Sequence, residues 1–430
     1  MDRLSIQGAG FAVALLLLPG CGGTQPPTGA PGTMPLQTDI APEWKDLGSA
    51  LPAVSYKALY EFEPSDGEDP VDALISVKGE FYGTTFAGGS GSCGSGGCGT
   101  VYKINKHGVE AALHRFGQGS DGINPDSGLL SVNGTLYGTT VAGGKFGDGT
   151  VYAINNTGSE KVLYNFRGGS DGANPAAALI NVNGTLYGTT QEGGVAGRCK
   201  GYTGAAGCGT VYSITTAGLE KVLHRFGGGS DGVSPFASLI SVKGTLYGTT
   251  YQGGSSSCYY ALGCGIVFTV DAKGSEKVLY RFKGGSDGSY PRSSLINVQG
   301  ALFGTTAYGA RSGCTDGCGS VYSVSLTGKE NVLHRFGSGS DGLRPYAGLT
   351  EVKGTLYGTT AAGGGAGEDG TIYSITLSGT EKVVYTFTGY EGRYPSAPLL
   401  NVNGRMYSTT SGGGNSGCEN GCGTVFALTL

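Results

Sequence analysis

Tyrosine and arginine side chains are concentrated in loops of the second half of this chain, between glycine-rich turns. A tyrosine ring stacks on the apolar face of a sugar, and a guanidinium pairs with carboxylates. The same residue types form hot spots in protein interfaces or pack locally within loops. The candidate ligand-binding residues are Tyr251, Tyr259, Tyr260, Tyr290, Arg292, Tyr308, Arg311, Arg344, Tyr346, Arg393 and Tyr394, with Phe236 beside them.

A second recurring feature is an acid followed by glycine, two variable residues and proline. The motif begins at Asp66, Asp121, Asp171, Asp231, Asp287, Asp341 and Glu391. A ring of acids suggests calcium, but a dedicated calcium loop places several acids within a few residues. Most of these loops hold a single acid. We therefore predict turns in which the carboxylate accepts hydrogen bonds from backbone N–H groups and proline ends the turn.

Acids that are not repeated are the candidates for catalysis. They include Asp126, Asp148, Glu192, Asp316, Glu368, Asp369 and Glu419. Glycoside hydrolysis needs two carboxyl groups about 5 to 10 Å apart, and no pair stands out by its spacing. The chain also lacks a nucleophile elbow, a phosphate loop and an HExxH motif. We predict no catalytic residue and no cofactor.

Ten of the eleven cysteines form five close pairs, which we predict to be disulfides because the count is even and the chain is predicted to be exported. The pairs are Cys93 with Cys98, Cys199 with Cys208, Cys258 with Cys264, Cys314 with Cys318, and Cys418 with Cys422. A zinc site is the alternative, but structural zinc needs four ligands and no histidine accompanies the pairs. We predict no metal site.

The elements that position these residues are set by an internal repeat. The string Tyr-Gly-Thr-Thr or a one-residue variant occurs seven times, 50 to 60 residues apart. In the third copy, residues 179–182 lead through Asn183-Gly184 to residues 185–190, and residues 209–214 and 221–226 follow. Asn-Gly and Lys-Gly between apolar runs predict type I′ hairpins. Each copy therefore has four antiparallel strands, here called A, B, C and D, as in a propeller blade.

Stacking and closure follow from the pattern of each strand. Strand D of the third copy alternates, which predicts Phe226 on one face and Leu223 on the other, so the sheet needs neighbours on both sides. His114, His224 and His334 share a strand D position with tyrosines, which predicts aromatic packing. Residues 56–62 match strand D and residues 423–428 match strand C. We predict an all-β, seven-bladed propeller over residues 53–430, closed by the N-terminal strand D pairing with the C-terminal strand C.

Strand direction predicts which loops share a face. The A–B and C–D turns lie at one end of each blade and are short and uniform. The B–C and D–A loops lie at the other end, and they hold every cysteine pair and most of the variation. Because binding residues favour variable loops on a rigid scaffold, we predict that this end is the functional face.

The run Leu-Tyr-Gly-Thr-Thr-x-x-Gly-Gly, the Gly-Thr-Val-Tyr strand and the Asp-Gly-x-x-Pro turn resemble the Gloeo/Verruco (GloVer) tandem-repeat family of prokaryotic surface proteins. The resemblance covers about residues 54–430. It implies an exported protein attached by an anchor signal, and it implies no particular reaction, ligand or catalytic residue.

The N-terminus reads as a targeting segment. Residues 1–21 resemble a lipoprotein signal peptide that ends in Leu18-Pro19-Gly20-Cys21, which predicts lipidation at Cys21. Residues 22–52 are rich in proline, glycine and threonine and predict a tether. The net charge of −4, with acids and bases interspersed, argues against nucleic acid as a partner. We expect a cell-envelope protein whose contact with the membrane is a lipid anchor, or alternatively a secreted protein.

Three functions remain open from the sequence. The first is a binding or interaction scaffold whose partner is a glycan or a protein held by the variable face. The second is a carbohydrate-active propeller enzyme, such as a polysaccharide lyase or a glycoside hydrolase, because fold does not fix function. The third is a structural surface spacer without a discrete ligand.

Overall fold

The computed structural model describes residues 54–430, except residues 90–92, 94–95, 118–119, 196–198, 200–206, 255–257, 259–262, 310–313, 315–316, 338–339 and 366. The predicted signal peptide, Cys21 and the tether lie outside the described residues, as do Tyr259, Tyr260 and Arg311.

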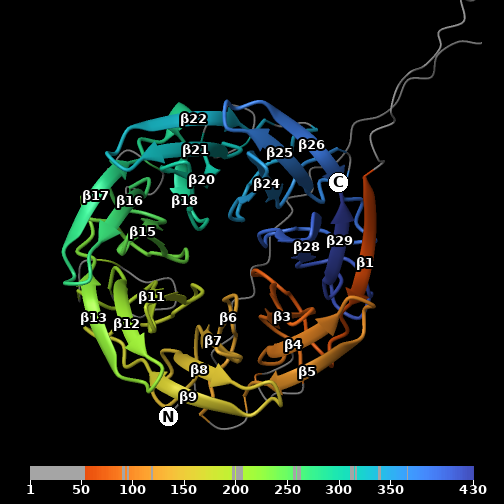
Figure 1. The fold of residues 1–430 in the computed structure, drawn as a ribbon, viewed down its shortest axis with the longest axis horizontal. Helices are drawn as coiled ribbons and strands as arrows, with labels where there is room; N and C mark the ends of the chain where they lie inside the picture. Colours follow the sequence, from red (N-terminus) through yellow and green to blue (C-terminus); the bar gives the residue numbers. More distant parts are fainter. Residues whose placement is uncertain are drawn as a thin grey trace, which may run out of the picture. The chain divides into compact units, whose positions relative to one another are not determined.

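The described chain forms seven antiparallel sheets arranged as blades around an axis (Figure 1). Blade 1 contains β2 (Ile75–Val77), β3 (Glu80–Thr85), β4 (Thr100–Asn105) and β5 (Glu110–Arg115). Blade 2 contains β6 (Leu130–Val132), β7 (Thr135–Thr140), β8 (Thr150–Ile154) and β9 (Glu160–Asn165). Blade 3 contains β10 (Ile180–Val182), β11 (Thr185–Thr190), β12 (Thr210–Thr215) and β13 (Glu220–Arg225). Blade 4 contains β14 (Ile240–Val242), β15 (Thr245–Thr250), β16 (Ile266–Val270) and β17 (Glu276–Arg281).

The remaining blades continue the ring. Blade 5 contains β18 (Ser289–Pro291), β19 (Ile296–Val298), β20 (Ala301–Tyr308), β21 (Ser320–Ser325) and β22 (Glu330–Arg335), after the short 3-10 helix η2 (Gly285–Asp287). Blade 6 contains β23 (Thr350–Val352), β24 (Thr355–Thr360), β25 (Thr371–Thr376) and β26 (Glu381–Thr386). Blade 7 contains β27 (Leu400–Val402), β28 (Arg405–Thr410), β29 (Thr424–Thr429) and β1 (Ser55–Glu61).

The ring closes as the sequence predicts. Strand β1 pairs antiparallel with β29, with Ser55 opposite Thr429 and Glu61 opposite Thr424. In Figure 1 the two ends of the described chain lie side by side in blade 7. The protein is therefore a seven-bladed β-propeller, and pairing the terminal strands completes the last sheet.

Blade 5 differs from the four-stranded pattern by its extra strand β18, which pairs with the extended β20. The other blades make a single bridge at the same place, for example between Ile123 and Ala142. Blade 5 thus strengthens a contact that all blades share, next to Tyr290.

The A–B turns are type I′, as predicted. Asn183 and Gly184 have φ angles of 53° and 85°, and both central residues of this turn type require positive φ. The turn fixes the register in which Val182 pairs with Thr185.

The hydrophobic core lies between blades. The strand D phenylalanine of each blade packs edge-on against a strand C ring of the next blade. Phe166 and Tyr212 have centroids 5.1 Å apart, and Phe226 and Phe268 are also 5.1 Å apart. The contact also joins the chain ends, where Phe62 lies 4.9 Å from Tyr102. Because each blade buries these rings only against a neighbour, the ring must close to be stable.

The glycine of the Tyr-Gly-Thr-Thr string makes room for the strand C tyrosine. A Cβ atom at Gly83 would lie 2.4 Å from the hydroxyl of Tyr102. In blade 7, Ser408 replaces this glycine, and its pairing partner is Phe426, which has no hydroxyl.

One sequence prediction about strand D is wrong. Each D strand contains a bulge; in blade 3, His224 pairs with Val211 and Val222 pairs with Tyr212, which leaves Leu223 between them unpaired. Leu223 therefore packs in the same interblade cluster as Phe226, not on the opposite face. The bulge interrupts the alternation on which the prediction rested.

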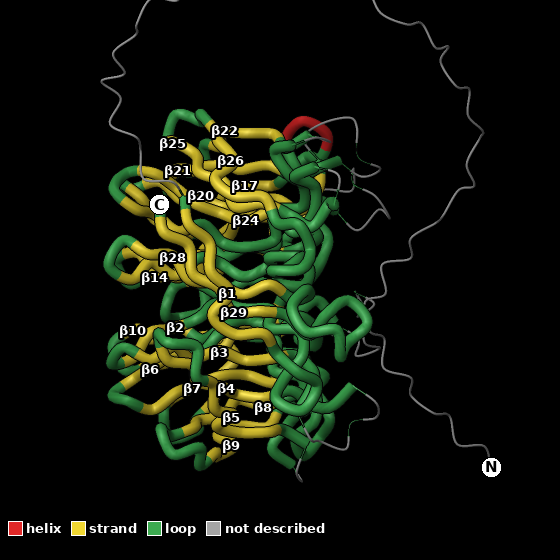
Figure 2. Tube along the Cα trace, turned by 90° about the vertical axis from the view of Figure 1, so that its right-hand side faces the viewer, coloured by secondary structure: helices red, strands yellow, loops and turns green. Residues whose placement is uncertain are grey.

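The strands order the loops as predicted. Figure 1 shows the A strands innermost and the D strands outermost. Figure 2 shows short turns at one end of the strands and the longer loops at the other. Among the described residues, no helix is long and apolar enough to cross a membrane.

Candidate functional site

The D–A loops that carry the candidate residues are built on the repeated acid. Asp171 accepts a hydrogen bond from the backbone N–H of Arg167 at 3.0 Å, and its other oxygen accepts one from the hydroxyl of Tyr164 at 2.7 Å. All seven acids accept a backbone N–H in this way. The predicted turn is confirmed.

The strand D tyrosines and histidines serve the same turn. Each packs edge-on against the phenylalanine two residues later, as His114 does against Phe116 at 4.8 Å. Each also faces the acid of its own loop. The predicted packing role is confirmed. The polar contact with the acid was not predicted from the sequence.

The residue before the loop proline has a left-handed conformation in all seven loops. It is Asp69, Asn124, Asn174, Ser234, Tyr290, Arg344 or Tyr394, with φ between 56° and 60°. Asn and Asp tolerate this region, whereas Tyr and Arg are uncommon there. Backbone strain at such positions is a mark of functional sites. The last three loops therefore hold side chains that local conformation alone does not favour.

The B–C loops form backbone hydrogen bonds with these left-handed residues. The N–H of Arg344 donates to the carbonyl of Cys318 at 2.9 Å, and that of Tyr290 donates to the carbonyl of Cys264 at 2.8 Å. All five predicted disulfides are present. In blades 2 and 6, which have no disulfide, Asp148 and Asp369 accept the equivalent bond. These two non-repeated acids thus take the structural place of a cysteine.

Six of the predicted ligand residues form one continuous group over blades 4 to 6. The rings of Tyr251 and Tyr290 lie 4.9 Å apart, and those of Tyr290 and Tyr308 lie 5.8 Å apart. The hydroxyls of Tyr308 and Tyr346 lie 3.3 Å apart. The guanidinium of Arg344 lies 6.0 Å from the centroid of Tyr308.

Arg292 is the centre of this group. Its guanidinium lies 4.4 Å from the ring centroid of Phe236 in blade 4 and 4.8 Å from that of Tyr346 in blade 6. Both distances are within cation–π range. Two neighbouring blades thus each place an aromatic ring against the arginine of blade 5.

Arg292 interacts electrostatically with three carboxyl groups on loops that lead into blades on the other side of the ring. They are Asp69 and Asp72, which lead into blade 1, and Asp126, which leads into blade 2; blade 5 lies across the axis from both (Figure 1). Burial raises the pKa of Asp126 to about 7; Arg292 opposes this rise, and Asp72 and Asp69 add to it. Burial also raises the pKa of Asp69 to about 6, and Arg292 again opposes it.

We call Asp69, Asp72, Asp126, Phe236, Arg292 and Tyr346 the axial cluster. It offers carboxyl groups whose raised pKa values let them donate in the protonated form and accept in the ionised form, and a guanidinium that donates, beside aromatic faces. That set matches a ligand with several hydroxyl groups and an apolar ring face, because each hydroxyl both donates and accepts.

The axial cluster contains residues that sequence reasoning missed. Asp69 and Asp72 were not among the candidates, although other loops carry Asn, Ser, Tyr or Arg at the first position and Ser or Ala at the second. This departure from the repeat could have identified Asp69 and Asp72 as candidates from the sequence. Asp72 is also tied to structure, since it accepts a hydrogen bond from the N–H of Gly128 in the next blade's loop.

Two predicted ligand residues lie apart from this group. Arg393 forms an ion pair with Asp369 at 3.1 Å and lies 5.6 Å from the ring centroid of Tyr394. Asp369 lies in the B–C loop of blade 6, whereas Arg393 and Tyr394 lie in the loop that leads into blade 7.

The repeated threonines have structural contacts. Thr85 and Thr100 join strands B and C through hydroxyls 2.9 Å apart, and Thr409 donates to the carbonyl of Pro70 in the next loop at 3.0 Å. A groove on the opposite face, lined by A strands and A–B turns of blades 5 to 7, holds one carboxylate, Glu351. Glu351 accepts a hydrogen bond from the N–H of Gly354 within its own turn.

Comparison with known proteins supplies the family. The model of the Gloeobacter/Verrucomicrobia repeat matches residues 49–202, 199–313 and 310–430. The chain belongs to this family. The matches together cover the propeller, which confirms the resemblance drawn from the Tyr-Gly-Thr-Thr and Asp-Gly-x-x-Pro motifs.

No curated protein matches the chain. Among solved structures, a quinohemoprotein alcohol dehydrogenase from Pseudomonas putida is similar at 11% identity and a TM-score of 0.48, over 87% of this chain and 76% of that one. A PQQ-bound aldose sugar dehydrogenase from Streptomyces coelicolor has 12% identity and a TM-score of 0.40, over 87% and 98%. The tricorn protease has 13% identity and a TM-score of 0.40, and this chain spans 28% of its length. These likenesses carry no activity over to this chain.

Proposed function

We propose that this Gloeobacter/Verrucomicrobia repeat protein binds a glycan at the axial cluster and acts as a binding scaffold of the cell envelope. The observation that carries the proposal is the contact of Arg292 with the rings of Phe236 and Tyr346, together with two carboxyl groups, Asp69 and Asp126, whose pKa values Arg292 lowers. Aromatic faces beside paired donors and acceptors suit a sugar better than an apolar ligand.

The unusual backbone at Tyr290 and Arg344 supports the same site. Both residues have a φ of 58°, and both belong to the aromatic group that continues from Tyr346. A side chain kept at a strained position is best explained by what it contacts. A ligand that extends beyond the axial cluster would therefore contact Tyr290 and Arg344.

Export and anchoring complete the proposal. Five disulfides are typical of a protein that leaves the reducing cytoplasm, and the proposed lipid at Cys21 would hold the propeller on a membrane. Metabolic labelling tests the anchor: growth with a radiolabelled fatty acid should label the wild-type chain and not Cys21→Ser. Equal labelling of both chains would contradict the anchor.

A glycan-array screen with the purified full-length chain tests the binding site. We expect binding that Arg292→Ala weakens at least about tenfold, which corresponds to about 1.4 kcal/mol. Arg225→Ala is the matched control, because its guanidinium donates to Ser170 at the rim and not at the axis. Equal binding by wild type and Arg292→Ala would contradict the site, and absence of any glycan binding would favour a protein partner or a spacer.

A carbohydrate-active enzyme is the second candidate, favoured by one observation. Burial raises the pKa of Asp126 to about 7, and the negative charges of Asp72 and Asp69 add to this rise. Two carboxyl groups in different protonation states are what glycoside cleavage uses. Incubation with each bound glycan, followed by product analysis, separates the candidates. Turnover that Asp126→Asn abolishes would establish the enzyme, and binding without turnover the scaffold.

A further inference from the structure

The three strand D histidines lie at blade interfaces that share one arrangement. Each histidine faces the acid of its own D–A loop, and a glutamate at the start of the next blade's strand D completes the set. The sets are His114 with Asp121 and Glu160, His224 with Asp231 and Glu276, and His334 with Asp341 and Glu381. At the other interfaces that carry a glutamate, tyrosine replaces histidine.

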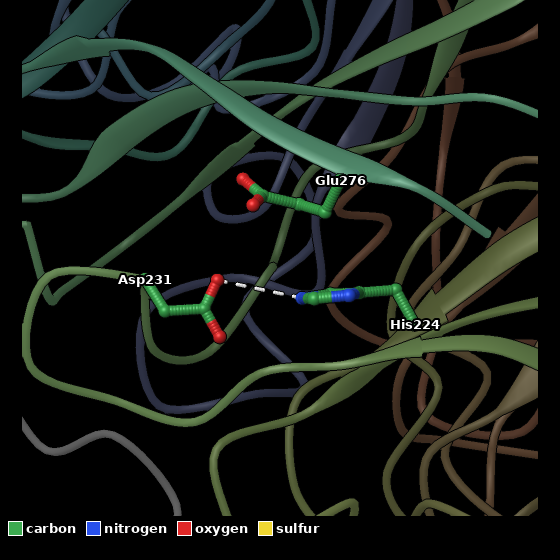
Figure 3. Close-up of side chains that lie close together, drawn as sticks. All are labelled: His224, Asp231 and Glu276. Atoms are coloured by element: carbon green, nitrogen blue, oxygen red, sulfur yellow. Dashed lines mark ion pairs between the residues drawn. The ribbon is translucent and has the colours of Figure 1, made fainter.

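The interface between blades 3 and 4 stands out among these sets. Figure 3 shows His224, Asp231 and Glu276 directed toward one another. One imidazole nitrogen and one oxygen from each carboxylate all lie within 4.8 Å of one another. The Nε2 atom of His224 is 3.4 Å from Oδ1 of Asp231.

Two buried polar atoms at this interface have no hydrogen-bond partner among the described residues. They are Nε2 of His224 and Oε1 of Glu276; the equivalent glutamates of the other interfaces also have an Oε1 that is unpaired within the described chain, so the histidine nitrogen is the atom that distinguishes this interface. Buried polar atoms without a partner call for an explanation. The other histidines differ, because His114 and His334 hydrogen-bond their aspartates at 3.0 Å and 3.3 Å.

The turn leaves one oxygen of Asp231 available. Its Oδ2 accepts the backbone N–H of Gly227 at 2.5 Å, while Oδ1 faces the imidazole. At the neighbouring interface the hydroxyl of Tyr280 occupies the equivalent position and donates to Asp287 at 2.6 Å. The tyrosine thus forms a hydrogen bond with the acid of its loop, whereas Nε2 of His224 forms none with the described residues.

We propose that His224, Asp231 and Glu276 bind a zinc ion that joins blades 3 and 4. A neutral imidazole and two carboxylates supply three ligands and balance the charge of a divalent cation, and a water molecule would be the fourth ligand. Ligand distances of about 2.0 to 2.2 Å place neighbouring donor atoms of tetrahedral zinc about 3.4 Å apart. The His224–Asp231 separation already has that value, and a rotation of the Glu276 side chain brings in the third ligand. Imidazole nitrogen favours zinc over calcium and magnesium, which prefer oxygen donors.

Titration calorimetry of the chelator-treated, full-length chain with zinc chloride tests this site. We expect one tight zinc ion per chain, and no comparable binding of calcium or magnesium. His224→Tyr should weaken zinc binding at least about tenfold, and it should fold, because tyrosine occupies the same position in blades 2 and 4. Glu276→Gln, which keeps the shape of the side chain, should weaken it similarly.

His114→Tyr and His334→Tyr are the matched controls and should leave the zinc affinity unchanged. Zinc should also raise the Tm of the wild type and not that of His224→Tyr, since a ligand that binds only the folded state stabilises it. Wild-type affinity in His224→Tyr, or loss of the zinc ion in either control variant, would overturn the assignment. So would a wild-type chain that binds no zinc. None of these outcomes bears on the axial cluster.

Discussion

The rim of the propeller and its axial cluster are built from the same repeat and follow opposite rules. At the rim, each interface repeats a phenylalanine against a strand C ring and a tyrosine or histidine against an acid. At the axis, the position after the loop proline holds Val71, Asp126, Ala176, Phe236, Arg292, Tyr346 and Ser396 in turn. Packing requires the same residue in every blade, whereas recognition requires differences. The comparison assigns stability to the rim and is consistent with the ligand binding that we propose at the axis.

The largest expected effect is on stability, at the rim. Phe226 is fully buried against Phe268, and Phe226→Ala should lower the free energy of unfolding by about 3 to 5 kcal/mol. Urea denaturation measures it. The control is Leu219→Ala in a C–D turn, where the side chain is 74% exposed and the change should be within about 0.5 kcal/mol. A small effect of Phe226→Ala would break the assignment of stability to the rim.

The pH dependence of stability is the next expected effect, and it also belongs to the rim. Burial raises the pKa of Glu110, Glu220 and Glu330 from 4.5 to about 7, and the neighbouring Asp66, Asp171 and Asp287 add to the rise. Between pH 4.5 and 7 the folded chain therefore binds more protons than the unfolded chain. By linkage, stability should fall as pH rises through this window and level off above it.

Thermal unfolding of the wild type and of Glu220→Gln across this range measures the slope. The glutamine has no proton to lose, so the variant should show a shallower fall than the wild type. Lys221→Gln, on the exposed side of the same strand, should keep the wild-type slope. A stability that rises from pH 4.5 to 7 would contradict the role of these glutamates.

The sequence predicts the rim much better than the axis, and the reason is physical. The repeat shows the phenylalanine at the position of Phe166 in all seven copies, the glycine of Gly188 in six and the tyrosine of Tyr212 in five. Matching terminal segments predict the closure of β1 on β29. The bulge at Leu223 was missed because alternation assumes a regular strand. Asp69 and Asp72 interact electrostatically with Arg292 from a distant part of the sequence, so no local spacing reveals them. Likewise, His224 and Glu276 come from different blades.

A smaller effect should separate stability from binding at the axis. Arg344 has a φ of 58°, and asparagine occupies the same place in blades 2 and 3, so Arg344→Asn should stabilise the fold by about 1 kcal/mol. The same change removes the guanidinium beside Tyr308 and should weaken glycan binding. Denaturation and the array screen measure the two effects. Asn124→Ala should destabilise without affecting binding. If Arg344→Asn destabilised the fold, the arginine would be there for packing.

The smallest expected effect tests whether every repeated residue serves stability. The hydroxyl of Tyr212 is buried and has no hydrogen-bond partner among the described residues. Blades 4 and 7 carry phenylalanine there, at Phe268 and Phe426. Because removing an unpaired buried hydroxyl ends its desolvation cost, Tyr212→Phe should stabilise the fold by up to about 1 kcal/mol in urea denaturation. Tyr164→Phe is the control, because it loses the hydrogen bond to Asp171 and should destabilise. Equal losses in both variants would show that the Tyr212 hydroxyl contributes to the rim after all.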